Sequence, residues 1–176
     1  YNLARFVTGL QTEAVSADLT SFVPGRQLDD NVHIMLRFEG GAKGMLWASQ
    51  VAVGKENGLQ LRVYGDKGGL EWSQENPNYM WFTKFGEPRQ LLTRGGAISG
   101  NAASTMNVRI PAGHPEGYLE AFATLYSQFA AVIRGDGAAY EGLLPSMADG
   151  VEGMQFITAS VQSSNNDGKW TRLSDV

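Results

Sequence analysis

The sequence contains no cysteine, few prolines and no apolar run long enough to cross a bilayer. The absence of cysteine excludes disulfides, thiolate metal ligands and a cysteine nucleophile. Positive charge is also scarce, because 14 lysines and arginines stand against 18 acidic residues and leave a net charge of −4. No basic stripe is available for nucleic acid or an anionic membrane, so neither is an expected partner. With no signal-peptide pattern, we expect a cytoplasmic protein.

Common signatures of catalysis are missing as well. The glycines never form G-x-G-x-x-G between a strand and a helix, and no P-loop or G-x-S-x-G elbow occurs. The two histidines, His33 and His114, show no recognisable metal-ligand spacing. The residues therefore predict no catalytic, cofactor-binding or metal-binding group in this chain, and we interpret His33 as an ordinary strand residue.

The length suits one domain with a sizeable core, and we expect residues 1–176 to form a single domain. The chain opens inside a helical pattern, because apolar residues before Gly9 recur at helical spacing and no capping residue precedes them. This pattern predicts a helix over Tyr1–Thr8. It also leads us to interpret the chain as a fragment of a longer polypeptide.

From Glu13 to about Leu92 the apolar pattern changes to a period of two, which is typical of strands. The 22 glycines supply short turns between them and leave no room for crossover helices, so the pairing should be antiparallel. A final edge strand is expected over 169–173. The other strands are expected at about 15–20, 32–38, 42–53, 59–64, 70–72, 79–84 and 89–92.

Together these elements predict an α+β fold with a large, mostly antiparallel open sheet and helices packed on one face. The other face is unusually apolar, and we expect a partner subunit to cover it as an oligomer interface. The alternative is an open face with scattered aromatic residues. The residues concerned are Met35, Met45, Trp47, Tyr64 and Trp72.

Two helices are expected after the strands, separated from them by a flexible loop over 95–110 that could close over a ligand. The first lies within Gly113–Gly135, and the second runs from a cap at Ser146 to about Ser164. Each carries a stripe that we expect to be buried. The stripes are Tyr118, Phe122, Leu125, Tyr126, Phe129, Val132 and Ile133, and Met147, Val151, Met154, Ile157 and Val161.

The entrance to the first of these helices is the best candidate for a polar ligand site. His114, Pro115 and Glu116 place an imidazole and a carboxylate beside helix N–H groups and the positive end of the helix dipole. The alternative is an ordinary helix opening, in which Pro115 starts the helix and His114 is a surface residue.

Several segments together resemble a known family. They are 47–59, 63–72, Gly113–Tyr118 with Glu120–Phe122, Pro145 with Asp149-Gly150, and Trp170. In combination they resemble the C-terminal domain of glucose-fructose oxidoreductase, inositol dehydrogenase and MocA-type (Gfo/Idh/MocA) dehydrogenases over nearly the whole chain.

The resemblance implies that the parent protein has an N-terminal Rossmann domain, which binds NAD or NADP and is absent from this chain. It further implies oxidation or reduction of hydroxyl and carbonyl groups on sugars, inositols and related polyols. The C-terminal domain of such enzymes shapes the substrate site and mediates assembly, so a homo-dimer or tetramer is expected. The family's Glu-Lys-Pro motif has no counterpart here, and its Asp and His pair would lie just before Tyr1. The fragment alone is therefore expected to bind neither NAD nor NADP and to be inactive.

On this interpretation His114, Glu116 and Tyr118 line the substrate pocket and exchange hydrogen bonds with sugar hydroxyls. Trp47 or Tyr79 could stack on the C–H side of a sugar ring. The alternative hypothesis is a stand-alone, non-catalytic carbohydrate-binding or assembly module.

Overall fold

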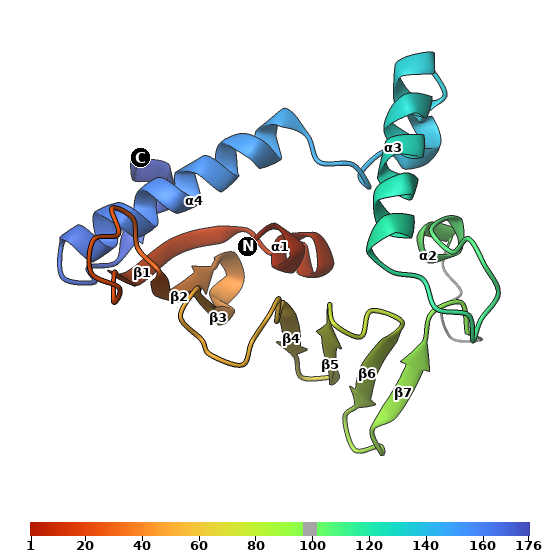
Figure 1. Cartoon of the computed structure of the whole chain (residues 1–176), viewed down its shortest axis with the longest axis horizontal. Helices are drawn as coiled ribbons and strands as arrows, with labels where there is room; N and C mark the ends of the chain where they lie inside the picture. Colours follow the sequence, from red (N-terminus) through yellow and green to blue (C-terminus); the bar gives the residue numbers. More distant parts are fainter. Residues whose placement is uncertain (97–101) are drawn as a thin grey trace. The chain divides into compact units, whose positions relative to one another are not determined.

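The computed structural model describes residues 1–96 and 102–176 and divides into two compact units (Figure 1). The first unit comprises Tyr1–Glu56 with Ser146–Val176, and the second comprises Asn57–Pro145. The first contains α1 (Asn2–Thr8), β1 (Thr12–Thr20), β2 (Asn31–Phe38), β3 (Lys43–Ser49), α4 (Met147–Asn165) and β8 (Thr171–Arg172). The second contains β4 (Gln60–Tyr64), β5 (Gly68–Ser73), β6 (Tyr79–Lys84), β7 (Gln90–Thr93), α2 (Ala102–Met106) and α3 (Tyr118–Arg134).

The α+β class with antiparallel sheets is confirmed. The strands form two four-stranded sheets, ordered β3-β2-β1-β8 in the first unit and β4-β5-β6-β7 in the second. The strand expected over 42–53 ends at Ser49, because the following residues turn and Gly54 adopts a φ of 88°. The expected edge strand is present as β8, which pairs with β1 at Ala14 and Val15.

The core of the first unit lies between α4 and one face of its sheet. Val15 and Ala17 of β1 lie opposite Leu36 and Ile34 of β2, and the four side chains point to this face. Phe156 of α4 packs against them, as do Ala159, Phe38 and Leu173. Because burying a Val, Leu, Ile or Phe side chain stabilises by roughly 1.5 to 3 kcal/mol, this layer is the main source of stability in the unit.

Two serines bind α4 to the backbone of β1. Ser163 Oγ accepts a hydrogen bond from Ala17 N at 2.9 Å, and Ser164 Oγ accepts one from Leu19 N at 3.0 Å. Strand β8 pairs with β1 only at Ala14 and Val15, so these two N–H groups lie beyond its reach. The serines satisfy donors that would otherwise be costly to leave unpaired beside the core.

The buried face of α4 differs from the expected one. The cap at Ser146 is confirmed, since its hydroxyl accepts from Asp149 N at 3.3 Å. However, the predicted stripe is exposed, with Met147 at 84% and Met154 at 61%, and the same holds for Val151, Ile157 and Val161. The buried residues are Phe156, Ala159, Ser160 and Ser163. The prediction was wrong because small serines allow close approach to β1 and bond its N–H groups, which hydrophobicity alone does not reveal.

The predicted N-terminal helix is confirmed as α1, which ends at Gly9 in the left-handed conformation. Arg5 binds α1 to α4 through ion pairs with Glu152 at 2.6 Å and Asp149 at 3.3 Å. Tyr1 stacks on Phe156 at 4.0 Å, and burial, followed by its hydrogen bond to Glu152, raises the pKa of the Tyr1 phenol to about 12. The start of the chain is therefore fixed on α4.

The second unit is built on a meander in which the two faces of the sheet differ. Leu61 pairs with Trp72, and Arg62 pairs with Glu71, so apolar and charged side chains alternate between the faces. Trp72 therefore lies on the face opposite Tyr64, which corrects the prediction that both share one face. Gly68 is the first residue of β5 and pairs with Lys84 of β6. A Cβ at Gly68 would lie 2.4 Å from the Thr83 carbonyl oxygen, so the close pairing of β5 with β6 requires glycine at this position.

Helix α3 begins at Tyr118, three residues later than a helix opened by Pro115 would. Its predicted apolar stripe is exposed rather than buried, with Tyr126 at 70% and Ile133 at 72%, whereas Gln128 and Ala131 are buried. The exposed stripe also includes Tyr118, Phe122, Leu125, Phe129 and Val132. Periodicity predicted the amphipathic helix correctly, but the apolar stripe of the helix is its exposed side.

The loop expected over 95–110 is only partly a loop. Residues 97–101 lie outside the described residues, and Ala102–Met106 forms the short helix α2. None of the helices in the described part of the chain is both long and apolar enough to span a membrane.

Candidate functional site

The segment before α3 folds around Glu116, which is only 8% exposed. Its Oε1 accepts hydrogen bonds from the backbone N–H groups of Arg109 at 2.7 Å and Ile110 at 2.9 Å. Its Oε2 lies 2.9 Å from Arg94 Nη1 in an ion pair. The carboxylate thus holds the loop together from the inside.

These bonds limit what Glu116 can offer to a ligand. A carboxylate accepts about four hydrogen bonds, and three donors already occupy this one. Substrate contact through Glu116 stays a prediction, and the geometry favours a role in shaping the loop.

Glu120 satisfies the N–H group of Gly117 at the start of α3. Glu120 Oε2 accepts a hydrogen bond from Gly117 N at 2.9 Å. This bond keeps the pKa of Glu120 below its ordinary value. One N–H group of the predicted polar-ligand site is therefore used by the protein itself.

His114 and Tyr118, the other two predicted site residues, present their side chains to solvent. The His114 side chain is exposed, while its backbone carbonyl accepts from Arg94 Nη2 and its backbone N–H donates to the Pro111 carbonyl at 3.2 Å. Tyr118 is 68% exposed, and its ring lies 4.7 Å from that of Phe122. An imidazole and a phenol, each able to donate or accept, are thus accessible at the start of α3. Their role as substrate contacts stays a prediction.

His33 is a strand residue, as expected, and its ring stacks on one aromatic neighbour on the exposed face of the first sheet. It lies opposite Trp47, and the two rings stack at 6.2 Å with an angle of 4°. Trp47 Nε1 donates to Asn31 Oδ1 at 2.9 Å, which holds the indole in place. Trp47 remains 56% exposed, and on the same face Met35 is 53% and Met45 73% exposed. The apolar face predicted for these three residues is therefore present.

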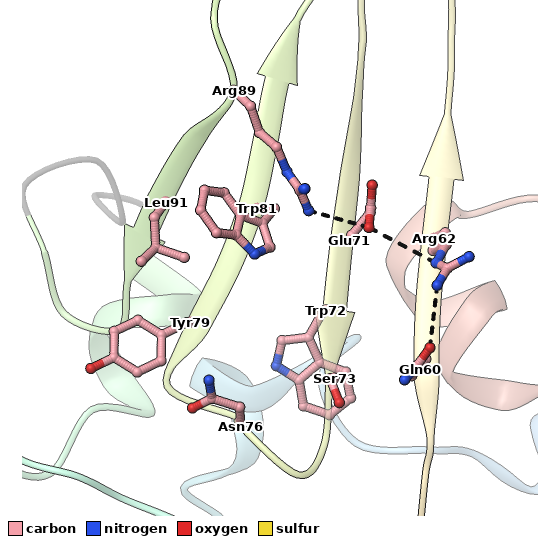
Figure 2. A pocket seen from close by; sticks show the side chains of 10 residues that line it. All are labelled: Gln60, Arg62, Glu71, Trp72, Ser73, Asn76, Tyr79, Trp81, Arg89 and Leu91. Carbon is pink, nitrogen blue, oxygen red and sulfur yellow. Dashed lines mark hydrogen bonds and ion pairs between the residues drawn. The ribbon is translucent and has the colours of Figure 1, made fainter.

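The charged face of the second sheet contains a cavity of about 370 Å³ that motif searches do not reveal (Figure 2). Figure 2 shows Glu71 between Arg62 and Arg89, which approach it to 3.9 and 3.3 Å. Arg89 also lies 4.2 Å from the ring centroid of Trp81, and Tyr79 lines the same cavity. The only signal in the sequence is the recurrence of charged and aromatic residues at alternate strand positions.

No group of three or more histidine, aspartate and glutamate side chains that could hold a metal ion occurs among residues 1–96 and 102–176.

The known proteins that this chain resembles are described as oxidoreductases. Residues 1–71 match the family described as the GFO/IDH/MocA C-terminal domain. The uncharacterized oxidoreductase YfiI of Bacillus subtilis (strain 168) is 32% identical over 170 residues, or 93% of this chain and 43% of that protein.

Solved structures extend the similarity to almost the whole chain. An oxidoreductase from Sinorhizobium meliloti has a TM-score of 0.92 and 55% identity, over 97% of this chain and 49% of that one. An inositol dehydrogenase homologue from Azotobacter vinelandii, solved with NADH and myo-inositol, has a TM-score of 0.88 and 36% identity. That match covers 97% of this chain and 47% of the homologue.

The fold and these relatives define the class of the chain as a GFO/IDH/MocA C-terminal domain, and the relatives themselves are described as oxidoreductases. The chain belongs to the GFO/IDH/MocA family, as the sequence resemblance implies. The chain spans about half the length of the relatives it matches.

Proposed function

We propose that this chain is the substrate-side domain of an NAD(P)-dependent dehydrogenase that acts on the CH–OH groups of sugars or polyols. The observation that carries the proposal is the 36% identity to a homologue solved with both NADH and myo-inositol. The chain matches 47% of that homologue, which leaves the other half available to hold the dinucleotide. Residues 1–176 would then act as a single C-terminal domain of a cytoplasmic enzyme.

The residues of this chain do not fit a dinucleotide, because no glycine-rich strand-to-helix turn is present to receive a pyrophosphate. Bound elsewhere in the parent enzyme, NAD or NADP would accept or donate the hydride. The contribution of this chain is recognition and orientation of the hydroxyl groups. His114 and Tyr118 supply donors and acceptors, and an exposed ring such as Tyr79 supplies an apolar surface for sugar C–H groups.

The exposed apolar surfaces fit a protein that is incomplete without partners. The stripes of α3 and α4 each consist of several large apolar side chains that are at least 41% exposed, which is unusual for an independent monomer. We assign these stripes to the missing Rossmann domain. The outward face of the first sheet, with Met35, Met45 and Trp47, is assigned to a second copy of the protein in a homo-dimer or tetramer.

The central test joins this chain to the remaining half of the Sinorhizobium meliloti oxidoreductase, whose C-terminal region is 55% identical to it. We expect the joined protein to bind NADH, measured by fluorescence titration, and to reduce NAD or NADP in the presence of myo-inositol or a hexose. The isolated chain should do neither. A His114→Ala substitution in the joined protein should raise KM for the polyol about tenfold, the loss of one hydrogen bond, with NADH affinity unchanged. A joined protein that binds NADH but oxidises no polyol or sugar would contradict the proposal.

The alternative, a stand-alone carbohydrate-binding module, is favoured by the cavity in Figure 2, which combines aromatic rings and charged groups without requiring a dinucleotide. The same experiment separates the two functions. A module would bind the carbohydrate equally well with and without the added half and would gain no dehydrogenase activity.

The assembly proposal predicts a change of mass when the first sheet's outward face becomes charged. We expect the joined protein to be a dimer or tetramer by light scattering, and Trp47→Asp combined with Met45→Asp to halve its mass or reduce it further, because buried unpaired charges oppose association. Asp66→Lys, an exposed substitution in the second unit, serves as a control and should leave the mass unchanged. A strict monomer at high concentration before any substitution would remove the proposal.

A further inference from the structure

Asn78 and Arg94, at the open end of the β6–β7 hairpin, form hydrogen bonds with the backbone of the segment that carries His114. Asn78 directly precedes β6 and Arg94 directly follows β7, and Arg94 N donates to Asn78 O at 2.9 Å. Arg94 Nε also donates to Asn78 Oδ1 at 2.9 Å. Asn78 and Arg94 are therefore held to each other independently of their contacts with the loop before α3. Together with Glu116 they are called here the Arg94 clasp.

The clasp holds the loop at several backbone groups. Arg94 Nη1 forms the ion pair with Glu116 at 2.9 Å, and Arg94 Nη2 donates to the carbonyl of His114. Asn78 Oδ1 accepts from Glu116 N at 3.0 Å, and Asn78 Nδ2 donates to Glu116 O at 2.9 Å. Only the planar guanidinium presents donors in several fixed directions, so lysine could not replace Arg94 here.

The burial of the clasp contrasts with the exposure of the residue it holds. The side chains of Arg94 and Glu116 are only 18% and 6% exposed, whereas the His114 side chain is exposed. A buried ion pair is weak evidence for net stability, but a fully bonded one selects a single backbone conformation. Fixing a backbone beneath an accessible polar side chain reduces the ordering cost when a ligand binds.

We propose that Asn78 and Arg94 are positioning residues for polyol recognition, which act through Glu116 to hold His114 in place. This inference rests on the proposed function and deepens it. It assigns Glu116 an indirect role and leaves contact with the hydroxyl groups to His114 and Tyr118.

The test uses NMR on the joined protein, in which the imidazole signal that His114→Ala removes is assigned to His114. We expect Arg94→Met to speed amide exchange of Arg109 and Ile110 at least tenfold and to raise the myo-inositol concentration that half-shifts the His114 signal about tenfold. Arg94→Lys should fail to restore either value. Lys84→Met is the matched control, because Lys84 is 64% exposed and pairs with Glu87 in the same unit, and it should change neither value.

The measurements distinguish failure of the positioning role of Asn78 and Arg94 from failure of the proposed polyol function. Unchanged exchange in Arg94→Met, or faster exchange with an unchanged myo-inositol response, would overturn the positioning role. Signals of the Tyr1 and Phe156 rings in the first unit report whether the rest of the chain is folded. If Arg94→Met does not fold, Glu116→Gln provides a milder variant for the same two measurements. A His114 signal that ignores myo-inositol before any substitution counts against the proposed polyol function, and the exchange rates still decide whether the clasp holds the loop.

Discussion

Replacement of Phe156 by alanine is expected to lower the free energy of unfolding of the first unit by about 3 to 5 kcal/mol. Phe156 is 7% exposed, packs on the inner face of β1 and β2, and stacks on Tyr1 at 4.0 Å. Alanine would leave a cavity in the layer between α4 and the sheet and would remove the ring against which the start of the chain rests. Urea unfolding of a chain labelled with 5-fluorotryptophan measures the effect, because Trp47 and Trp170 report on this unit alone.

The neighbouring residue is a sharp control. Ile157 belongs to the stripe that helical periodicity predicts to be buried, but it is 54% exposed. Ile157→Ala should therefore cost less than about 1 kcal/mol in the isolated chain, since little surface is removed from contact. Equal losses at both positions, or a larger loss at Ile157, would show that α4 packs through its other face.

Replacement of Glu116 by alanine is expected to destabilise the second unit by about 3 kcal/mol, because removing one member of a buried ion pair leaves the other without a partner. Arg94 would lose its carboxylate, and the N–H groups of Arg109 and Ile110 would lose their acceptor. The fluorine signals of Trp72 and Trp81 follow the unfolding of this unit.

Glu87 provides the matched comparison, because it is also a glutamate paired with a cation in the second unit, but its side chain is 42% exposed. Exposed pairs contribute about 0 to 1 kcal/mol, so Glu87→Ala should have little effect. If Glu116→Ala is equally mild, the buried carboxylate does not hold the loop as the distances indicate.

The regular elements could be predicted because their causes are local. The period-two pattern around Ile34 and Leu36 gives β2, and Ser146 followed by Asp149 gives the start of α4. Gly9, which has a positive φ, ends α1 at the position that the helical spacing of apolar residues predicts. The family resemblance came from such local motifs as well, and the solved relatives confirm it.

The role of Glu116 could not be predicted, because its partners are distant in sequence. Arg94 lies 22 positions before it and Asn78 lies 38 positions before it, and no spacing rule connects a residue before a helix with both ends of a hairpin. Sequence patterns placed a carboxylate beside His114, and only the folded hairpin shows that this carboxylate faces inward.

By itself, the sequence determined the class of the fold, most element boundaries, the family and the amphipathic character of both long helices. The tertiary structure decided which face of α4 is buried, which face of its sheet Trp72 occupies and which of the three candidate site residues remain accessible. The physical reason is that periodicity depends on neighbours three or four residues apart, whereas burial depends on what the rest of the chain brings to that side. On α4 the serines that bond β1 placed the apolar stripe outward, on the face that we assign to the rest of the enzyme.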